Sequence, residues 1–467
     1  MTEPTPTFDP LPERRVFCNR TLNMRSIQAV GFDMDYTLVH YTVHEWEARA
    51  YAHVQQRLRE QGLPVGDLRF DPDLFARGLI VDRDLGNIVK ASRFGYVTQA
   101  AHGTRILEFE ERRKTYSQVW VDLAEKRWVF LNTLFSLSEA CLFGQIVELH
   151  DAGKLGADLD YAGLYDLVRG TMDAAHLEGA LKAEIIADPE RFVDLDPDLP
   201  QALLDLQQAG KKLFLATNSE WHYTGPMMSY VFDRFLPGSD WRSLFDLVIV
   251  QARKPAFFDG NAAFEAVPDT RGPVQLGGNA QLVQAHFGLD GEQILYVGDH
   301  VYADVHVSSR IRRWRTALVI RELEDEVRAE QTFVADQRVL EDGMEAKGRL
   351  EQEQVMLRLG LQRLEQGSAL PEGVVGSAHD LRERLRLLRT AVETIDQRLI
   401  PLAQQSGQLG HARWGPLMRA GNDKSRLARQ IEGHADIYTS RVSNLLWLTP
   451  FGYLRAARGS LPHDARG

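Results

Sequence analysis

Residues 27–35, IQAVGFDMD, decide the fold of this chain. The stretch begins with an apolar run of the length of a buried strand, and two carboxylates, Asp33 and Asp35, follow directly. In open α/β proteins, ligands bind beyond the carboxyl ends of the parallel strands. The sequence therefore predicts a strand at residues 27–32 whose end lies at a functional site.

Further apolar runs of the same kind follow along the chain. They occupy residues 212–216, 244–250, 293–298 and 315–320, and helical patterns such as those at residues 45–61 and 200–209 lie between runs. Apolar strands that alternate with helices are typical of a parallel sheet covered on both faces. We therefore expect an α/β fold with a doubly wound parallel sheet, of the kind called a Rossmannoid core.

Changes in composition divide the chain into five predicted parts. They are an N-terminal arm at 1–26, the first part of the core with a hairpin insertion at 27–126, a helical cap at 127–195, the second part of the core at 196–322 and a C-terminal helical region at 323–467. In the last part, two charged helical stretches flank a break rich in Gly, Pro and Ser at 367–376, which predicts an antiparallel helical hairpin. The simplest role of this hairpin is packing or oligomerisation, so formation of a homo-oligomer is one of the alternatives.

The composition argues against several classes of partner. The chain carries 54 Lys and Arg against 65 Asp and Glu, a formal net charge of -11, which disfavours nucleic acids and anionic membranes. The N-terminus does not resemble a secretory signal, and no apolar run approaches the roughly 20 residues of a membrane helix. Cys18 and Cys141 form neither a disulfide framework nor a metal-ligand spacing. We expect a cytoplasmic protein that acts on a small molecule.

Polar side chains stand at the ends of the predicted strands. Asp33 and Asp35 follow the first strand, Thr217 and Asn218 the second, Lys254 lies beyond the third in ARKPAFF, and Asp299 and Asp304 follow the fourth in GDHVYAD. A lone DxD is more often a turn or a solvated pair. The four features occur together and in this order along the chain, which favours one shared site over a chance coincidence.

Cleavage of a phosphate ester needs this set of groups. A carboxylate that attacks a dianionic phosphoryl group must be helped by cations, and Mg²⁺ prefers oxygen ligands such as Asp33 and Asp299. Lys254 can neutralise charge on the transferring oxygens, and Thr217 can donate a hydrogen bond to them. Asp35 can protonate the leaving group and later deprotonate water.

The motifs GFDMDYTL, LATNS, RKP and YVGDHVYAD resemble the four signature motifs of the haloacid dehalogenase superfamily. The stretches LGNIVKASRFGYVTQAAHG and FLNTLFSLSEACLF are similar to the cytosolic IMP/GMP-type purine 5′-nucleotidases, over roughly the first 320 residues. The resemblance implies a magnesium-dependent phosphatase with Asp33 as nucleophile and Asp35 as acid/base. Mg²⁺ would be held by the Asp33 side chain, the Asp35 carbonyl and Asp299, while Asp304 would orient Lys254 or metal-bound water.

A predicted cap helix carries Arg169, Asp173 and His176 on one face, and Lys182 follows within two turns. By themselves these residues are most simply an exposed Arg–Asp pair beside a histidine. The resemblance implies instead that they bind purine and phosphate. An Asp carboxylate can accept from N1–H of a 6-oxopurine while Arg donates to its O6, which would favour IMP or GMP over AMP.

Phe135 stands where the resembled family stacks an aromatic ring on the base, and its alternative role is a core aromatic of the cap. Leu177 stands where the family has an aromatic residue, and Ser136 where it has Asn. Both departures lie near the predicted nucleoside site. The preference for base and sugar therefore stays open.

Two other interpretations remain. A phosphatase of the same mechanism could act on another small phosphate ester, and a non-catalytic scaffold could bind a partner through the C-terminal helices. For a nucleotidase, the sequence does not rank water against a nucleoside hydroxyl as the acceptor, so phosphotransfer stays open beside hydrolysis.

Overall fold

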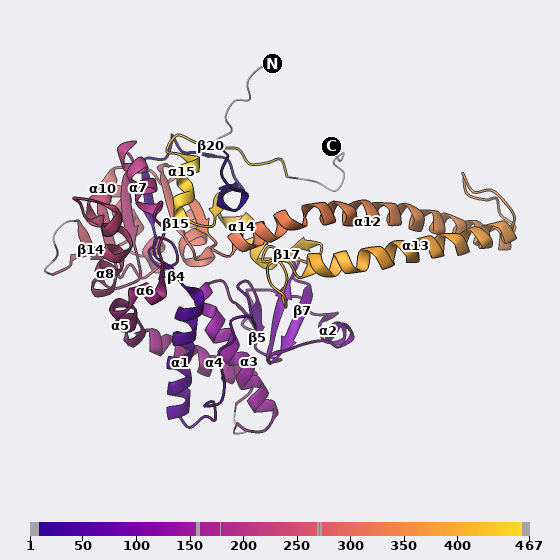
Figure 1. Ribbon diagram of the computed structural model, residues 1–467, viewed down its shortest axis with the longest axis horizontal. Coiled ribbons are helices and arrows are strands. Elements are labelled where there is room, and N and C mark those ends of the chain that lie inside the picture. Colours follow the sequence, from indigo (N-terminus) through magenta and orange to yellow (C-terminus); the bar gives the residue numbers. More distant parts are fainter. Residues whose placement is uncertain (1–8, 156–158, 178, 269, 271–272, 460–467) are drawn as a thin grey trace, which may run out of the picture. The chain divides into compact units, whose positions relative to one another are not determined.

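The computed structural model describes residues 9–155, 159–177, 179–268, 270 and 273–459. The chain divides into two compact units, which are treated separately below. The first comprises Met1–Asp325 and Leu417–Gly467, and the second comprises Glu326–Pro416 (Figure 1).

The first unit is built on a nine-stranded sheet in the order β1-β19-β16-β15-β3-β11-β12-β14-β13. Its strands are β1 (Phe17–Cys18), β3 (Ala29–Phe32), β11 (Lys212–Ala216), β12 (Leu247–Val250), β13 (Phe264–Ala266), β14 (Val274–Gly277), β15 (Ile294–Gly298), β16 (Arg315–Val319) and β19 (Ile437–Thr439). Neighbouring strands are parallel except at the two edges, where β1 and β13 run antiparallel to β19 and β14. The predicted parallel α/β sheet is confirmed.

The central strands are apolar because the protein covers both of their faces. Every residue of β3, β12 and β15 is buried. The helix α7 (Leu199–Gln208) contacts β11, and α11 (Val307–Arg312) contacts β16. Gly31 in β3 leaves room for the Phe214 ring, since a Cβ at Gly31 would lie 2.1 Å from that ring. The buried runs of the sequence are therefore strands of a sheet sandwiched between helices.

A large insertion separates β4 (His40–Tyr41) from β10 (Val193–Asp194). These two strands pair antiparallel, so both ends of the insertion leave the core side by side. Its helices are α1 (Val43–Glu60), α2 (Phe109–Tyr116), α3 (Leu137–Asp151), α4 (Tyr161–Leu177), α5 (Ala180–Ala187) and α6 (Pro189–Phe192). Helices α1, α3 and α4 contact one another and form a helical layer of the insertion; α3 and α4 lie within the cap predicted at 127–195, whereas α1 precedes it.

The insertion also contains a five-stranded antiparallel sheet in the order β8-β7-β6-β5-β9. Its strands are β5 (Ile80–Asp82), β6 (Asn87–Ala91), β7 (Val97–His102), β8 (Arg105–Ile106) and β9 (Trp128–Phe130). The hairpin expected within residues 77–90 is its β5–β6 pair. The segment from residue 127, expected to be helical, begins with β9, because its aromatic and β-branched residues pair with β5.

Residues 417–459 do not continue the helical region but return to the first unit. They form β17 (Arg419–Ala420), β18 (Asp423–Lys424), α14 (Arg426–His434), β19, α15 (Leu445–Leu448) and β20 (Tyr453–Leu454), which pairs with β2 (Leu22–Asn23). The helical region predicted at 323–467 includes these residues, and for them that prediction is wrong. A strand as short as β19 gives only a weak hydrophobic pattern in the sequence, which is difficult to recognise after two long charged helical stretches.

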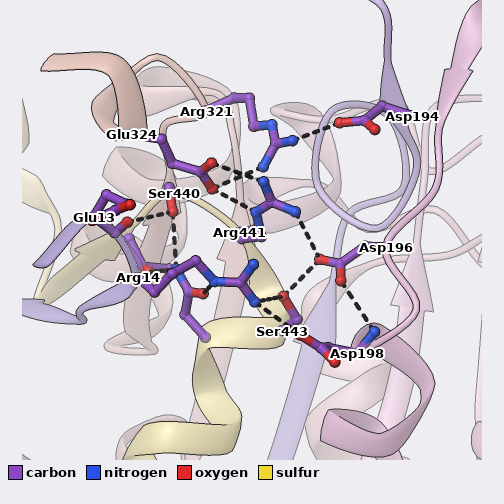
Figure 2. Close-up of polar contacts among 12 residues, drawn as sticks. Glu13, Arg14, Asp194, Asp196, Asp198, Arg321, Glu324, Ser440, Arg441 and Ser443 are labelled. Carbon is purple, nitrogen blue, oxygen red and sulfur yellow. Dashed lines mark hydrogen bonds and ion pairs between the residues drawn. The ribbon is translucent and has the colours of Figure 1, made fainter. Parts of the chain in front are cut away.

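A polar network fastens this returning segment (Figure 2). Arg441 bonds to Glu324 at 2.5 Å, and Glu324 also bonds to Arg321. Arg321 reaches Asp194 of β10 at 2.5 Å. Farther along, Ser443 donates to Asp196 at 2.6 Å. The network thus joins the C-terminal segment to the strand where the cap insertion ends.

The remaining helices of the first unit are short. They include α8 (Trp221–Phe232), α9 (Ala256–Asp259) and α10 (Ala280–Phe287). The two cysteines, Cys18 and Cys141, are free thiols. None of the helices in the described ranges has both the length and the apolar character needed to cross a membrane.

The second unit consists of most of α12 (Leu323–Glu365) and α13 (Ala378–Gly407). The two helices flank the break at 367–376, as the sequence predicted. Ser377 and Asp380 form a capping box at the start of α13, and Lys347 of α12 bonds to Asp396 of α13 at 2.5 Å. Leu357, Leu381 and Leu385 form a small buried core between the helices.

Candidate active site

The register of the sheet brings four strand ends to one edge. Phe32 of β3 stands opposite Leu215 of β11 and Val297 of β15. Asp33, Thr217 and Asp299 therefore leave neighbouring strands at nearly the same height. Lys254 follows β12 on the far side of β11. These side chains, widely separated in the sequence, share the carboxyl edge of one parallel sheet.

Lys254 is the buried cation of this edge. Its Nζ lies 2.7 Å from Asp33 Oδ1 and 2.7 Å from Asp304 Oδ1, and its side chain is only 3% exposed. The same Nζ lies 3.2 Å from the Tyr296 hydroxyl, which donates to the Ala216 carbonyl. Lys254 thus joins the nucleophile candidate to Asp304. Sequence reasoning missed Tyr296, which lies inside an apolar strand.

The carboxylates outnumber this cation. Burial raises the pKa of Asp33 to about 7, against the opposing effect of Lys254 and with further increases from Asp304 and Asp35. Burial also raises the pKa of Asp299 well above its usual value, and Asp304 and Asp33 add to that effect. Like charges in a water-poor site disfavour their own ionisation. A further cation at this edge would therefore favour the ionised forms of these carboxyl groups.

A divalent cation fits this arrangement. One oxygen from each of Asp33, Asp299 and Asp304 lies within 4.8 Å of the other two. Asp304 already accepts from Lys254 through Oδ1 and from the His300 amide through Oδ2 at 3.1 Å. Asp33 accepts from Lys254 and the Met34 amide through Oδ1. Asp33 Oδ2 and the Asp299 carboxylate are thus the oxygens that could hold Mg²⁺.

Asp35 is held by two hydroxyl groups. Tyr41 donates to Asp35 Oδ1 at 2.5 Å, and Ser219 donates to Asp35 Oδ2 at 2.8 Å. Tyr41 in turn lies 2.9 Å from the Tyr223 hydroxyl. The clamp depends on the turn after Asp35, where Tyr36 takes a positive φ of 55°. Ser219 stands in the LATNS motif, but its partner could not be known from the sequence.

The loop after β11 supports the same edge. Thr217 is fully buried, and its Oγ1 accepts from the Ser219 amide at 3.0 Å. The Asn218 side chain accepts from the Lys254 amide at 2.6 Å and donates to the Lys254 carbonyl at 3.1 Å. Asn218 therefore orients the Lys254 loop, while the Thr217 hydroxyl keeps its proton available for a phosphate oxygen.

Two of the predicted substrate residues lie beside the core. The Phe135 ring packs edge-on against Tyr36, with centroids 4.6 Å apart. Lys182 of α5 bonds to Glu220 at 2.8 Å, and Glu220 directly follows Ser219. These contacts bring two cap segments next to the Asp35 clamp.

The other predicted substrate residues lie on α4. Arg169 bonds to the buried Glu139 at 2.8 Å and to Asp173 at 3.3 Å, and the Arg169 and Asp173 side chains are 49% and 56% exposed. Glu139 also accepts from the Tyr165 hydroxyl. His176 belongs to α4, but its side chain lies outside the described part of the chain. Arg169 and Asp173 thus form the exposed pair that their spacing predicted.

Comparisons with known proteins place the chain in a family. The family model described as the 5' nucleotidase family matches residues 16–466. A 5'-nucleotidase domain-containing protein of Dictyostelium discoideum is 27% identical over 483 residues, which cover 98% of this chain and 76% of that protein.

The solved structures that match the chain include the following two. An archaeal beta-phosphoglucomutase from Pyrococcus sp. strain ST 04 is 9% identical, with 63% of this chain and 86% of that chain covered and a TM-score of 0.30. A HAD phosphatase from Thermococcus onnurineus is 13% identical, with coverages of 63% and 87% and a TM-score of 0.26. From the family match across nearly the whole sequence, this chain belongs to the 5' nucleotidase family and is a phosphoric monoester hydrolase.

Proposed function

We propose that this chain is a magnesium-dependent 5′-nucleotidase that hydrolyses purine nucleoside 5′-monophosphates in the cytoplasm, with a preference for IMP and GMP. The observation that carries the proposal is the buried cluster in which Lys254 lies 2.7 Å from both Asp33 and Asp304, beside Asp299. A phosphoryl group needs a nucleophile and positive charge at the same place, and this cluster offers both.

In the proposed reaction, one carboxylate oxygen of Asp33 attacks phosphorus while the bond from phosphorus to the 5′ oxygen breaks. Asp35 gives its proton to the departing 5′ oxygen, and the product nucleoside leaves. Asp35 then takes a proton from water, whose oxygen attacks the phospho-aspartate and releases phosphate and the free Asp33 carboxylate. Tyr41 and Ser219 hold Asp35 for both transfers.

The remaining groups stabilise charge. Lys254 and the Thr217 hydroxyl would contact the equatorial phosphoryl oxygens, and Asn218 and Asp304 would keep Lys254 in place. Mg²⁺, held by the Asp33 side chain, the Asp35 carbonyl and Asp299, would supply positive charge to the phosphoryl oxygens. A nucleoside hydroxyl in place of water would complete phosphotransfer instead of hydrolysis.

The purine preference rests on the cap. Phe135, which packs beside Tyr36, would stack on the base, and Asp173 with Arg169 would bind the N1–H and O6 of a 6-oxopurine. His176 and Lys182 complete the proposed substrate set. The bond from Arg169 to buried Glu139 would fix the guanidinium that faces O6.

A second candidate is a phosphatase with the same chemistry and a different small phosphate ester. Leu177 and Ser136, which depart from the pattern of the resembled purine nucleotidases, favour it. The two candidates share the same catalytic residues at the sheet edge and differ only in the substrate that the residues of the cap would bind.

Initial rates with IMP, GMP, AMP, pyrimidine monophosphates and sugar phosphates, each with and without Mg²⁺, test the proposal. We expect IMP and GMP to be hydrolysed fastest and only with the metal. Faster turnover of sugar phosphates would support the second candidate. A folded protein without phosphatase activity in Mg²⁺ would support a scaffold that binds partners through α12 and α13.

A further inference from the structure

Arg77 is a buried arginine outside all four motifs. It lies in the chain before β5 of the insertion, and its side chain is 2% exposed. Burying a guanidinium without partners is costly, so its contacts indicate what it is there to hold. The Nε donates to the Asn132 carbonyl at 2.8 Å, and Nη2 donates to the Asp299 carbonyl at 2.5 Å. The Nη1 lies 3.5 Å from Glu322 Oε2.

These acceptors belong to three separate segments. Asp299 directly follows β15 and is a proposed magnesium ligand. Asn132 lies in the loop after β9, three residues before Phe135, the proposed base-stacking ring. Glu322 follows β16 and precedes α12. The two main-chain contacts therefore join the metal loop to the loop that carries the aromatic ring.

The planar fork of Arg suits this task. Its donors point in fixed directions within one plane, so two carbonyls bound to them are fixed relative to each other. A Lys ammonium carries the same charge but lacks that rigid fork. The contacts of Arg77 are thus specific to its shape as well as to its charge.

We infer that Arg77 is a positioning residue that holds the Asp299 loop and the Phe135 loop in register, so that the metal and the substrate base are bound at a fixed separation. The inference rests on the proposed function, in which Asp299 binds Mg²⁺ and Phe135 stacks on the base. Arg77 touches main-chain carbonyls and does not contact the reacting atoms.

The test compares three variants of the full chain with the wild type. Arg77→Gln removes the charge and the fork, whereas Arg77→Lys keeps the charge. The matched control is Arg127→Gln, because Arg127 belongs to the same insertion and bonds to buried Asp82 of β5 at 2.7 Å, which is not a residue of the strand-end cluster. Mg²⁺ affinity is measured by calorimetry without substrate, folding by circular dichroism, and KM and kcat with IMP.

We expect Arg77→Gln to weaken Mg²⁺ binding about tenfold or more, the usual effect of losing a group that orients a metal ligand. Its KM for IMP should rise as well, because the Phe135 loop loses the same anchor. Arg77→Lys should restore part of the Mg²⁺ affinity. Arg127→Gln should lower thermal stability and leave Mg²⁺ affinity unchanged.

A fourth variant separates the carbonyl contacts from the ion pair. Glu322→Gln removes only the charge beside Arg77 Nη1, so we expect near-normal Mg²⁺ affinity. If Glu322→Gln weakened Mg²⁺ as strongly as Arg77→Gln, the ion pair would be the active element and the inference would be wrong.

Two further outcomes would overturn the inference. One is a folded Arg77→Gln or Arg77→Lys protein with wild-type Mg²⁺ affinity and wild-type KM. The other is an equal loss of affinity in Arg127→Gln, which would mean that general loosening of the insertion is the cause. If Arg77→Gln does not fold, the Arg77→Lys result decides by the same criteria. A wild type that binds no Mg²⁺ would instead contradict the proposed function itself.

Discussion

The charged side chains at the edge of the nine-stranded sheet and those on α4 have similar composition but different surroundings. At the sheet edge, the side chains of Asp33, Lys254 and Asp304 are 12%, 3% and 1% exposed. On α4, Arg169 and Asp173 are about half exposed, and Arg169 pairs both with Asp173 and with buried Glu139. Buried carboxylates in excess of their cations are expensive, and such strain marks functional sites, whereas an exposed pair has little energetic weight.

This difference in burial indicates that the chemistry depends on the sheet edge and that α4 has another role. A substitution that changes one charge at the sheet edge should lower the activity of the enzyme. This loss should be the same whichever base the substrate carries. The α4 cluster should affect only recognition of the substrate.

Asp33→Asn should lower kcat by at least about 1000-fold, because the amide is not a nucleophile for phosphorus. The side chain keeps its shape, so thermal unfolding should show an intact fold. Steady-state rates with IMP and Mg²⁺ measure the change. Activity within tenfold of wild type would mean that the sheet edge is not the catalytic centre.

Tyr41→Phe and Ser219→Ala should each lower kcat about tenfold with little change in KM, because each removes one hydroxyl that orients Asp35. Tyr51→Phe is the matched control. The Tyr51 hydroxyl bonds to Gln145 within the cap, and its loss should leave kcat unchanged. An unaltered kcat in both clamp variants would remove Tyr41 and Ser219 from the mechanism.

Asp173→Ala should raise KM for IMP about fivefold and leave the Mg²⁺ requirement unchanged, because only base recognition is lost. Asp166→Ala is the control on the same helix, since Asp166 pairs with Arg83 at 2.5 Å and has no proposed contact with the base. Equal KM values for Asp173→Ala and wild type would assign the α4 pair to the protein surface alone.

Glu47→Gln tests whether a buried carboxyl by itself marks catalysis. Burial raises the pKa of Glu47 from 4.5 to about 8, although Ser138 opposes the increase by donating to it. Native Glu47 keeps its proton up to about pH 8, whereas the unfolded chain releases it near its ordinary pKa. Stability from Glu47 therefore falls as the pH rises between these values.

Glutamine mimics the protonated form at every pH. We expect Glu47→Gln to unfold nearly like wild type near pH 5 and to be more stable by roughly 3 kcal/mol near pH 8, with kcat unchanged. Denaturant unfolding at both pH values measures the difference. A variant less stable than wild type at pH 8, or one with a large loss of kcat, would contradict this view of Glu47.

The sequence predicted the core of the fold well because its signals are local. The run at residues 212–216 coincides with β11, and the helix expected at 200–209 is α7, one residue earlier at each end. Continuous apolar runs can only be satisfied in a sheet covered on both faces. The antiparallel strands β7 and β8 escaped notice because they are only partly buried, so their pattern is not distinctive.

The residues of the site likewise fall into those that the sequence predicts and those that it does not. Asp33, Thr217, Lys254 and Asp299 could be named from the sequence, because each follows an apolar run and the ends of parallel strands must share an edge. Tyr296 and Arg77 could not. Both lie outside the polar strand ends, and their roles come from contacts with residues dozens to hundreds of positions away.

By itself, therefore, the sequence determined the parallel core, the two-helix hairpin and the chemical groups at the strand ends, since hydrophobic period and residue type are local properties. Only the tertiary structure decided that Tyr41 and Ser219 clamp Asp35, that Arg77 joins two loops, and that residues 417–459 return to the main sheet. Those pairings are chosen by burial and geometry among many residues of equal chemistry, and that choice is made when the chain is packed.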